Sequence, residues 1–183
     1  MKKMILIAVA LLAAQGAVAA PAAEKSLTLL LAGGPEENKI EITLSPDGRS
    51  YVIDSVVPLE VGGEVCVNPP GMPTELICQA TSIGGFEVNA GAGNDIVSLA
   101  REIAVPVTLR GGAGNDELFA GAGGDMLIGG SGNDRLIARG GADSVLGGEG
   151  SDRLVGGSGN DLLRGGPGDD VLVGGSGVND LAQ

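Results

Sequence analysis

The chain has no histidine, no tryptophan, one tyrosine and two phenylalanines among 183 residues. Without histidine there is no His-based general base and no HExxH metalloprotease motif. A GxSxG nucleophile elbow is absent as well. Aromatic side chains supply much of a conventional core, so the core of this chain is expected to be narrow and aliphatic. A glycosidase that uses only carboxylates is disfavoured, because the part of the chain outside the repeats described below is too small for such a domain. We therefore expect a protein that is not an enzyme.

Positive charge is also scarce, with a formal net charge of −12. A basic footprint for nucleic acid is missing, and we expect no nucleic-acid partner. The acidity either keeps a secreted protein soluble or indicates that cations are the partners. The positions of the acids decide between these two interpretations.

Long apolar runs are confined to the N-terminus. Lys2 and Lys3 precede an apolar stretch, and Ala17-Val18-Ala19 is typical of a signal-peptidase site. The run is short for a membrane anchor, so we expect a Sec-type signal peptide over residues 1–19 and no membrane span. Its removal would change the formal charge from −12 to −14. The product is expected to be secreted and extracellular, with the periplasm as the alternative.

Glycine, by contrast, is abundant, with 34 residues, and from residue 111 it recurs with a period of nine. Seven consecutive units keep phase, from GGAGNDELF to GGPGDDVLV. An eighth, GGSGVNDLA, reads as carrying one inserted residue, and an isolated unit begins at Ala90. Every phased unit has glycine at position four and a branched aliphatic at position eight. Position six is always aspartate: Asp95 in the isolated unit, then Asp116, Asp125, Asp134, Asp143, Asp152, Asp161 and Asp170.

This pattern resembles the GGxGxDxUx nonapeptide of the RTX, or hemolysin-type, calcium-binding repeat proteins. The resemblance covers residues 90–183. It implies an all-β, right-handed parallel β-roll (β-solenoid) in which each unit contributes a six-residue loop and a three-residue strand. Two units complete a turn, so loops two units apart stack. It also implies that Ca²⁺ binds between stacked loops, held by the eight aspartates named above and by backbone carbonyls.

The residue types fit these roles. Glycine permits positive φ at sharp turns, and calcium takes six to eight oxygen ligands from carboxylates and carbonyls. The alternative is a bare solenoid whose aspartates only form turns. Position five does vary among Asn, Gly, Ala, Ser and Asp, as turn residues do, but position six does not vary in the phased units. We therefore favour calcium sites.

The preceding segment, residues 24–89, does not repeat cleanly and is expected to form irregular opening turns that cap the roll. In it, GGPEENKIEI reads as a degraded unit with Asn38 in the aspartate position. KIEITL and SYVIDSVV flank the turn sequence SPDG, which predicts a β-hairpin. REIAVPVTL, from Arg101, is expected to complete a turn without a calcium loop.

The two edges of the roll are expected to differ. Loops beginning at Gly111, Gly129, Gly147 and Gly165 share one edge, and each has all three glycines. On the other edge Ala138 and Arg139 replace the first two glycines of one loop. Arg139 would adopt positive φ at a cost and would place a cation beside a cation site. We expect the loop around Asp143 to be the weakest in calcium binding.

The predicted function is that of a secreted calcium-binding protein in which calcium is coupled to folding. The alternative is a calcium-dependent surface-adhesion or matrix module that presents one face of the roll to a cell-surface or extracellular-matrix partner. Positions seven and nine mix residue types and identify no such partner.

Cys66 and Cys78 are the only cysteines, and both follow the predicted signal peptide. In an oxidising compartment such a pair favours a disulfide, although two buried thiols are the alternative. Closing this short loop would stabilise the fold by roughly 3 kcal/mol in the chain-entropy treatment.

Non-reducing peptide mapping should recover the two cysteines linked. Two freely alkylated thiols in the native protein would refute the prediction.

Overall fold

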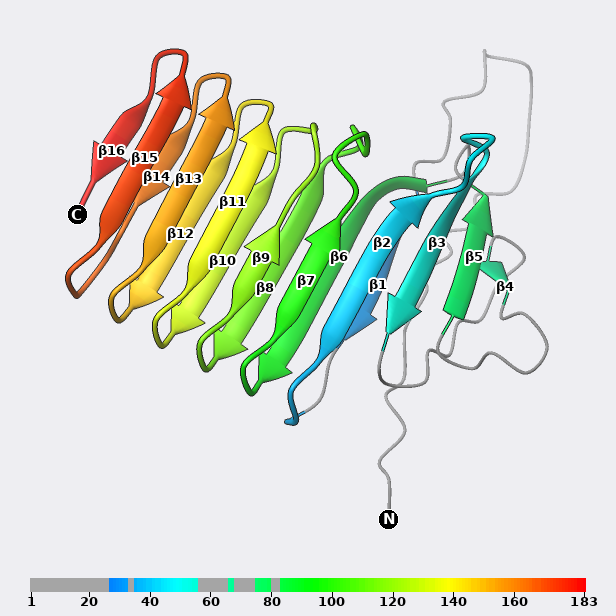
Figure 1. Ribbon diagram of the computed structural model, residues 1–183, viewed down its shortest axis with the longest axis horizontal. Coiled ribbons are helices and arrows are strands. Elements are labelled where there is room, and N and C mark those ends of the chain that lie inside the picture. The colour runs from blue at the N-terminus through cyan, green and yellow to red at the C-terminus, as the bar shows by residue number, and fades with distance from the viewer. Residues whose placement is uncertain (1–26, 33–34, 56–65, 68–74, 80–82) are drawn as a thin grey trace, which may run out of the picture.

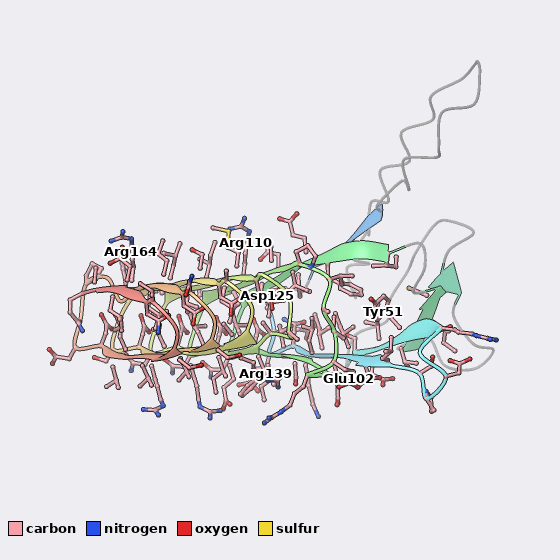
Figure 2. All side chains as sticks on the ribbon, turned by 90° about the horizontal axis from the view of Figure 1, so that it is seen from above. Tyr51, Glu102, Arg110, Asp125, Arg139 and Arg164 are labelled. Carbon is pink, nitrogen blue, oxygen red and sulfur yellow. The ribbon has the colours of Figure 1, made fainter. Side chains whose placement is uncertain are left out.

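In the computed structural model, the chain forms two facing β-sheets joined by short loops into a flattened solenoid (Figure 1). The structure describes residues 27–32, 35–55, 66–67, 75–79 and 83–183, so the predicted signal peptide lies outside the described residues. Seen from above, the sheets are two layers with side chains between and outside them (Figure 2). Within the described ranges, no helix is long and apolar enough to cross a membrane.

Among the described residues, the first sheet has seven strands, all paired in parallel. Every strand from β6 onwards comes from a successive turn of the solenoid. In spatial order the strands are β1 (Leu27–Ala32), β6 (Ile83–Ala92), β8 (Val107–Ala113), β10 (Met126–Ser131), β12 (Ser144–Glu149), β14 (Leu162–Arg164) and β16 (Asp180–Ala182).

The second sheet has nine strands in the part of the chain that the structure describes. It is parallel from β15 to β2, then antiparallel from β2 to β4. In spatial order they are β15 (Val171–Ser176), β13 (Arg153–Ser158), β11 (Arg135–Gly140), β9 (Glu117–Phe119), β7 (Ile96–Leu99), β2 (Lys39–Leu44), β3 (Ser50–Ser55), β5 (Glu75–Gln79) and β4 (Cys66–Val67).

The leader continues the solenoid, because β1 and β2 extend the same two sheets as the repeats. The predicted hairpin is confirmed as β2 and β3, which pair antiparallel. Its turn is closed by the Gly48 amide, which donates to the Ser45 carbonyl at 2.8 Å. Gly48 has a φ of 69°, a conformation that glycine adopts without a steric penalty. The all-β parallel solenoid expected from the repeats is confirmed.

Position eight of the repeat points into the space between the sheets, as period-two alternation along a strand requires. Its side chains form a continuous aliphatic ladder that is 0% exposed from Val97 through Leu118 and Leu127 to Leu163. Aromatic side chains enter the core only in the wider leader, where Tyr51 and Phe86 pack edge to face with ring centroids 4.9 Å apart. The narrow aliphatic core expected for the repeats is therefore observed.

Several strands are longer than the three residues expected. β10, for example, runs from Met126 to Ser131, so it continues through the first three positions of the next unit. The backbone pairing of β10 skips Gly129 and resumes at Gly130, which pairs with Gly112 and Gly148. Backbone pairing therefore reaches into the glycine-rich loop and leaves only positions four to six as the turn.

Glycine at positions two and four is required by close approach as well as by φ. Gly130 has a φ of 125°, and a Cβ placed there would stand 2.0 Å from the Gly112 carbonyl oxygen. At position four, a Cβ on Gly132 would stand 2.1 Å from the Gly114 oxygen. Each turn thus directs two carbonyls at the backbone of the next turn.

Cys66 and Cys78 lie directly opposite each other in the antiparallel pair of β4 and β5. Opposed residues in such a pair have Cα atoms about 4.5–5.5 Å apart, which is within the range of a disulfide. Cys78 is fully buried. The register is compatible with the predicted disulfide, which stays a prediction.

Replacing Gly130 with alanine should destabilise the roll strongly. Backbone strain alone costs roughly 1–3 kcal/mol, and the clash with Gly112 adds to it. Gly124→Ala is the matched control, because Gly124 is not among the positive-φ glycines and its Cβ would lie 3.3 Å from the nearest atom. Thermal unfolding should show a clearly lower Tm for Gly130→Ala than for Gly124→Ala. Equal Tm values would contradict the role given to close approach.

Candidate metal centre

The sixth-position residues form two files, one along each edge of the solenoid. Neighbours within a file are joined by a hydrogen bond from the backbone amide of one to Oδ1 of the next. The first file consists of Asn38, Asp95, Asp116, Asp134, Asp152 and Asp170. The second consists of Asp125, Asp143, Asp161 and Asn179. The predicted stacking of alternate units is confirmed.

Asn38 and Asn179 occupy the sixth position with a side-chain amide in place of a carboxylate. Asn38 heads the first file, as its place in the degraded unit predicts. Asn179 ends the second file, eighteen residues after Asp161, and Leu181 pairs in register with Leu163. The expected insertion in the last unit is therefore wrong. That unit keeps phase, with Asn179 at position six and Asp180 at position seven.

Seven of the eight aspartates are buried, with Asp116 1% and Asp134 3% exposed, and Asp170 is half-buried. Oδ1 of each aspartate except Asp125 accepts the backbone bond just described, at 2.8 Å for Asp116 N to Asp134 Oδ1. Oδ2 is buried and has no hydrogen-bond partner among the described residues in seven of the eight: Asp95, Asp116, Asp134, Asp143, Asp152, Asp161 and Asp170. A buried carboxylate oxygen without a partner carries a large desolvation cost.

The surroundings of Oδ2 are rich in oxygen. The point where a Cβ of Gly129 would stand is 2.2 Å from Asp134 Oδ2 and 2.5 Å from the Gly147 carbonyl oxygen of the next turn. The same arrangement recurs at Gly147, with Asp152 Oδ2 at 2.3 Å and Gly165 O at 2.7 Å. A carboxylate oxygen and a carbonyl oxygen therefore converge on the space left by glycine at position one.

Asn38 resolves this convergence of acceptors with a hydrogen bond, because its Nδ2 donates to the Ala90 carbonyl of the next turn at 3.1 Å. Asn179, at the end of the second file, donates from Nδ2 to the Gly175 carbonyl of its own loop at 3.4 Å. The Gly175 bond is long and weak. Where aspartate replaces asparagine, the donor is lost and a negative charge is gained. A cation is the species that satisfies both oxygens at such a place.

Asp125 is the exception among the eight predicted ligands. Its Oδ1 accepts from the Val107 amide at 3.0 Å, and its Oδ2 accepts from the Gly121 amide at 3.2 Å. Both oxygens of this carboxylate are thus bound by backbone donors.

The chemistry of the donor set matches calcium rather than zinc. Among the described residues, no three His, Cys, Asp or Glu side chains cluster closely enough to hold a metal by themselves. A metal between turns would therefore need backbone carbonyls in addition to the carboxylates. Calcium accepts such mixed oxygen ligands at flexible geometry, so the residues present fit this ion.

Burial also changes the acidity of these carboxyls. Desolvation raises the pKa of Asp143 to about 7 and the pKa of Asp134 to about 6. It raises the pKa of Asp125 to about 6 as well. Neighbouring aspartates of the same file add to the increase for Asp134 and Asp143, because like charges oppose ionisation. Without a cation, the folded state favours protonated carboxyls.

A second ladder was not foreseen from the sequence. At position five, the amide of Asn115 donates to Asn94 Oδ1 at 2.8 Å, and the amide of Asn133 donates to Asn115 Oδ1 at 2.7 Å. Ser151 N continues the series to Asn133 Oδ1. The recurrence of asparagine at position five in the first three loops of this edge is the signal that would have identified it.

Residues 108–136, 120–154 and 146–181 match the family described as the RTX calcium-binding nonapeptide repeat, which comprises four copies. The region from 108 to 181 is therefore an RTX repeat array, as the sequence pattern indicates. No curated protein and no solved structure matches the chain.

The raised pKa values predict an unusual pH dependence for the metal-free protein. A carboxyl with a pKa near 3.8 when unfolded and 6–7 when folded binds protons more tightly in the folded state. The free energy of unfolding should then decrease as the pH rises through about 4 to 7. In chelator, the β-structure content by far-UV circular dichroism should be higher at pH 5 than at pH 8, and Asp143→Asn should reduce the difference. A metal-free protein that becomes more stable over this range would contradict the prediction.

Proposed function

We propose that this protein binds Ca²⁺ between the stacked loops of its solenoid and that the bound ions stabilise the folded repeats. The observation that carries the proposal is the series of seven buried Oδ2 atoms without partners. In the loops with glycine at position one, such as that of Asp134, the atom faces a backbone carbonyl of the next turn. The proposed ligands are Asp95, Asp116, Asp134, Asp143, Asp152, Asp161 and Asp170, together with backbone carbonyls.

Calcium supplies two positive charges where buried carboxylate and carbonyl oxygens converge. The aspartates position their oxygens through the backbone bonds to Oδ1, and the glycines keep the space open. Without the ion, each file stacks carboxylates that repel one another, while many glycines are ordered at full entropic cost. Binding free energy thereby contributes to folding free energy.

The protein is further proposed to be exported by its N-terminal signal, to carry the Cys66–Cys78 disulfide and to be non-catalytic. The repeat family and the absence of histidine support a non-catalytic role. The adhesion alternative gains no specific support. The outward position-nine residues of the second sheet, Phe119, Ile137, Val155 and Val173, are not a row of identical threonines or aromatics.

Far-UV circular dichroism during a calcium titration tests the proposal. In chelator at pH 8 the repeat array should lose most of its β-structure, and millimolar calcium should restore it. Magnesium should be a poor substitute because it demands tighter octahedral geometry. Asp134→Asn should raise the calcium midpoint, whereas Asp54→Asn, in an exposed strand position outside the files, is the matched control. A spectrum unchanged by exhaustive chelation would overturn calcium-coupled folding.

A further inference from the structure

Arg139 departs from the repeat in a way that the calcium files do not explain. It lies at position two of its loop, in strand β11, where the other repeats carry glycine. Its φ is 77°, and it is the one non-glycine residue with positive φ in the described part of the chain. Such a conformation is strained and persists only when the surroundings enforce it.

The guanidinium group of Arg139 makes the contacts that offset this strain. Its NH1 donates to the carbonyl oxygens of Leu99 and Ala120, each at 2.5 Å. The side chain also lies over the Phe119 ring, with Cζ 5.9 Å from the centroid. Figure 2 places Arg139 on the opposite layer from the outward-pointing Arg110 and Arg164.

Leu99 and Ala120 are position-one residues of two earlier turns of the second sheet. Their carbonyls correspond to those of Gly147 and Gly165, which in regular loops face an unpartnered Oδ2. The preceding segment on this edge, residues 100–106, contributes no sixth-position aspartate. The positive side chain of Arg139 therefore binds position-one carbonyls. In regular turns, carbonyls at this position face the carboxylate of the sixth-position aspartate.

The Cβ of Arg139 also changes the loop beneath it. At position two of regular loops, the carbonyl oxygen of the preceding turn lies 1.9–2.3 Å from the place of a Cβ. Such an oxygen cannot stand beside the Cβ of Arg139. Accordingly Gly121, the residue of the preceding turn, lacks the positive φ of its counterparts, and its amide turns to Asp125 Oδ2.

These observations concern one place, the start of the second edge. We infer that Arg139 and the Gly121 amide take the place of a calcium ion on this edge, in the loops up to and including residues 120–125. Calcium on this edge then begins between the loops of Asp143 and Asp161. This inference rests on the proposed calcium function and assigns a metal-independent segment within it.

Calcium stoichiometry, measured on the full chain by native mass spectrometry, tests the inference. Arg139→Gly restores glycine at position two of the loop and should bind one calcium ion more than the wild type. The control is Arg153→Ala, which removes an equal charge from an exposed position of the same sheet and should leave the number unchanged. Equal numbers for Arg139→Gly and the wild type, with calcium bound to both, would overturn the inference.

A second pair of variants covers the case in which Arg139→Gly does not fold. Asp125→Asn should keep the wild-type number of ions, because both oxygens of Asp125 are bound by amides. Asp152→Asn, in the first file, should lower that number. A loss of calcium from Asp125→Asn equal to that from Asp152→Asn would show that the segment does bind metal.

Hydrogen exchange in chelator separates this inference from the proposed function. Amides of β7 and β9 should stay protected without calcium in the wild type and in Arg153→Ala, and should lose protection in Arg139→Ala. Equal protection in all three would contradict the role of Arg139. Absence of calcium binding in the wild type would instead overturn the proposed function and the metal replacement together.

Discussion

The fold depends on the way each buried sixth-position aspartate divides its two carboxylate oxygens. Oδ1 accepts the amide of the equivalent residue one turn earlier, as Asp152 does for Asp134 at 2.7 Å. That bond fixes the vertical register of the turns and orients the carboxylate. Oδ2 is then left facing a carbonyl of the following turn. The interaction that builds the stack therefore also leaves the buried acceptor for which we propose a cation.

Glycine makes this arrangement possible in two separate ways. At position one, the missing Cβ leaves room for the carboxylate, as at Gly129 beside Asp134. At positions two and four, it lets the carbonyl of the preceding turn approach the backbone of the next. Ordering so many glycines is entropically costly, and the aliphatic ladder between the sheets is narrow. Hydrophobic burial alone therefore has little margin, so we expect neutralisation of the buried carboxylates to affect the stability of the whole array.

Much of the fold and of the candidate site could be predicted from the sequence, because one nonapeptide pattern with one backbone geometry recurs many times. The phase of nine gave the two edges, the inward position eight and the place of Asn38. Isolated features were less accessible. The last unit appeared to contain an insertion because Asp180 follows Asn179, and only the register of Leu181 with Leu163 shows that Asn179 holds position six. The hydrogen bond from the Gly121 amide to Asp125 depends on a backbone change that accompanies the Cβ of Arg139. The sequence shows Arg139 as a departure from the repeat but not this effect on the preceding turn.

The stacking period has a consequence for how such a chain can change in length. Equivalent loops are eighteen residues apart, so gain or loss of one nonapeptide would move every later unit to the opposite sheet. The contacts of Arg139 with Leu99 and Ala120, which reach back over two turns, would then be lost. Duplication or deletion of eighteen residues beyond Arg139 preserves them and keeps each file intact. The array is thus expected to grow and shrink in paired repeats, from its C-terminal side.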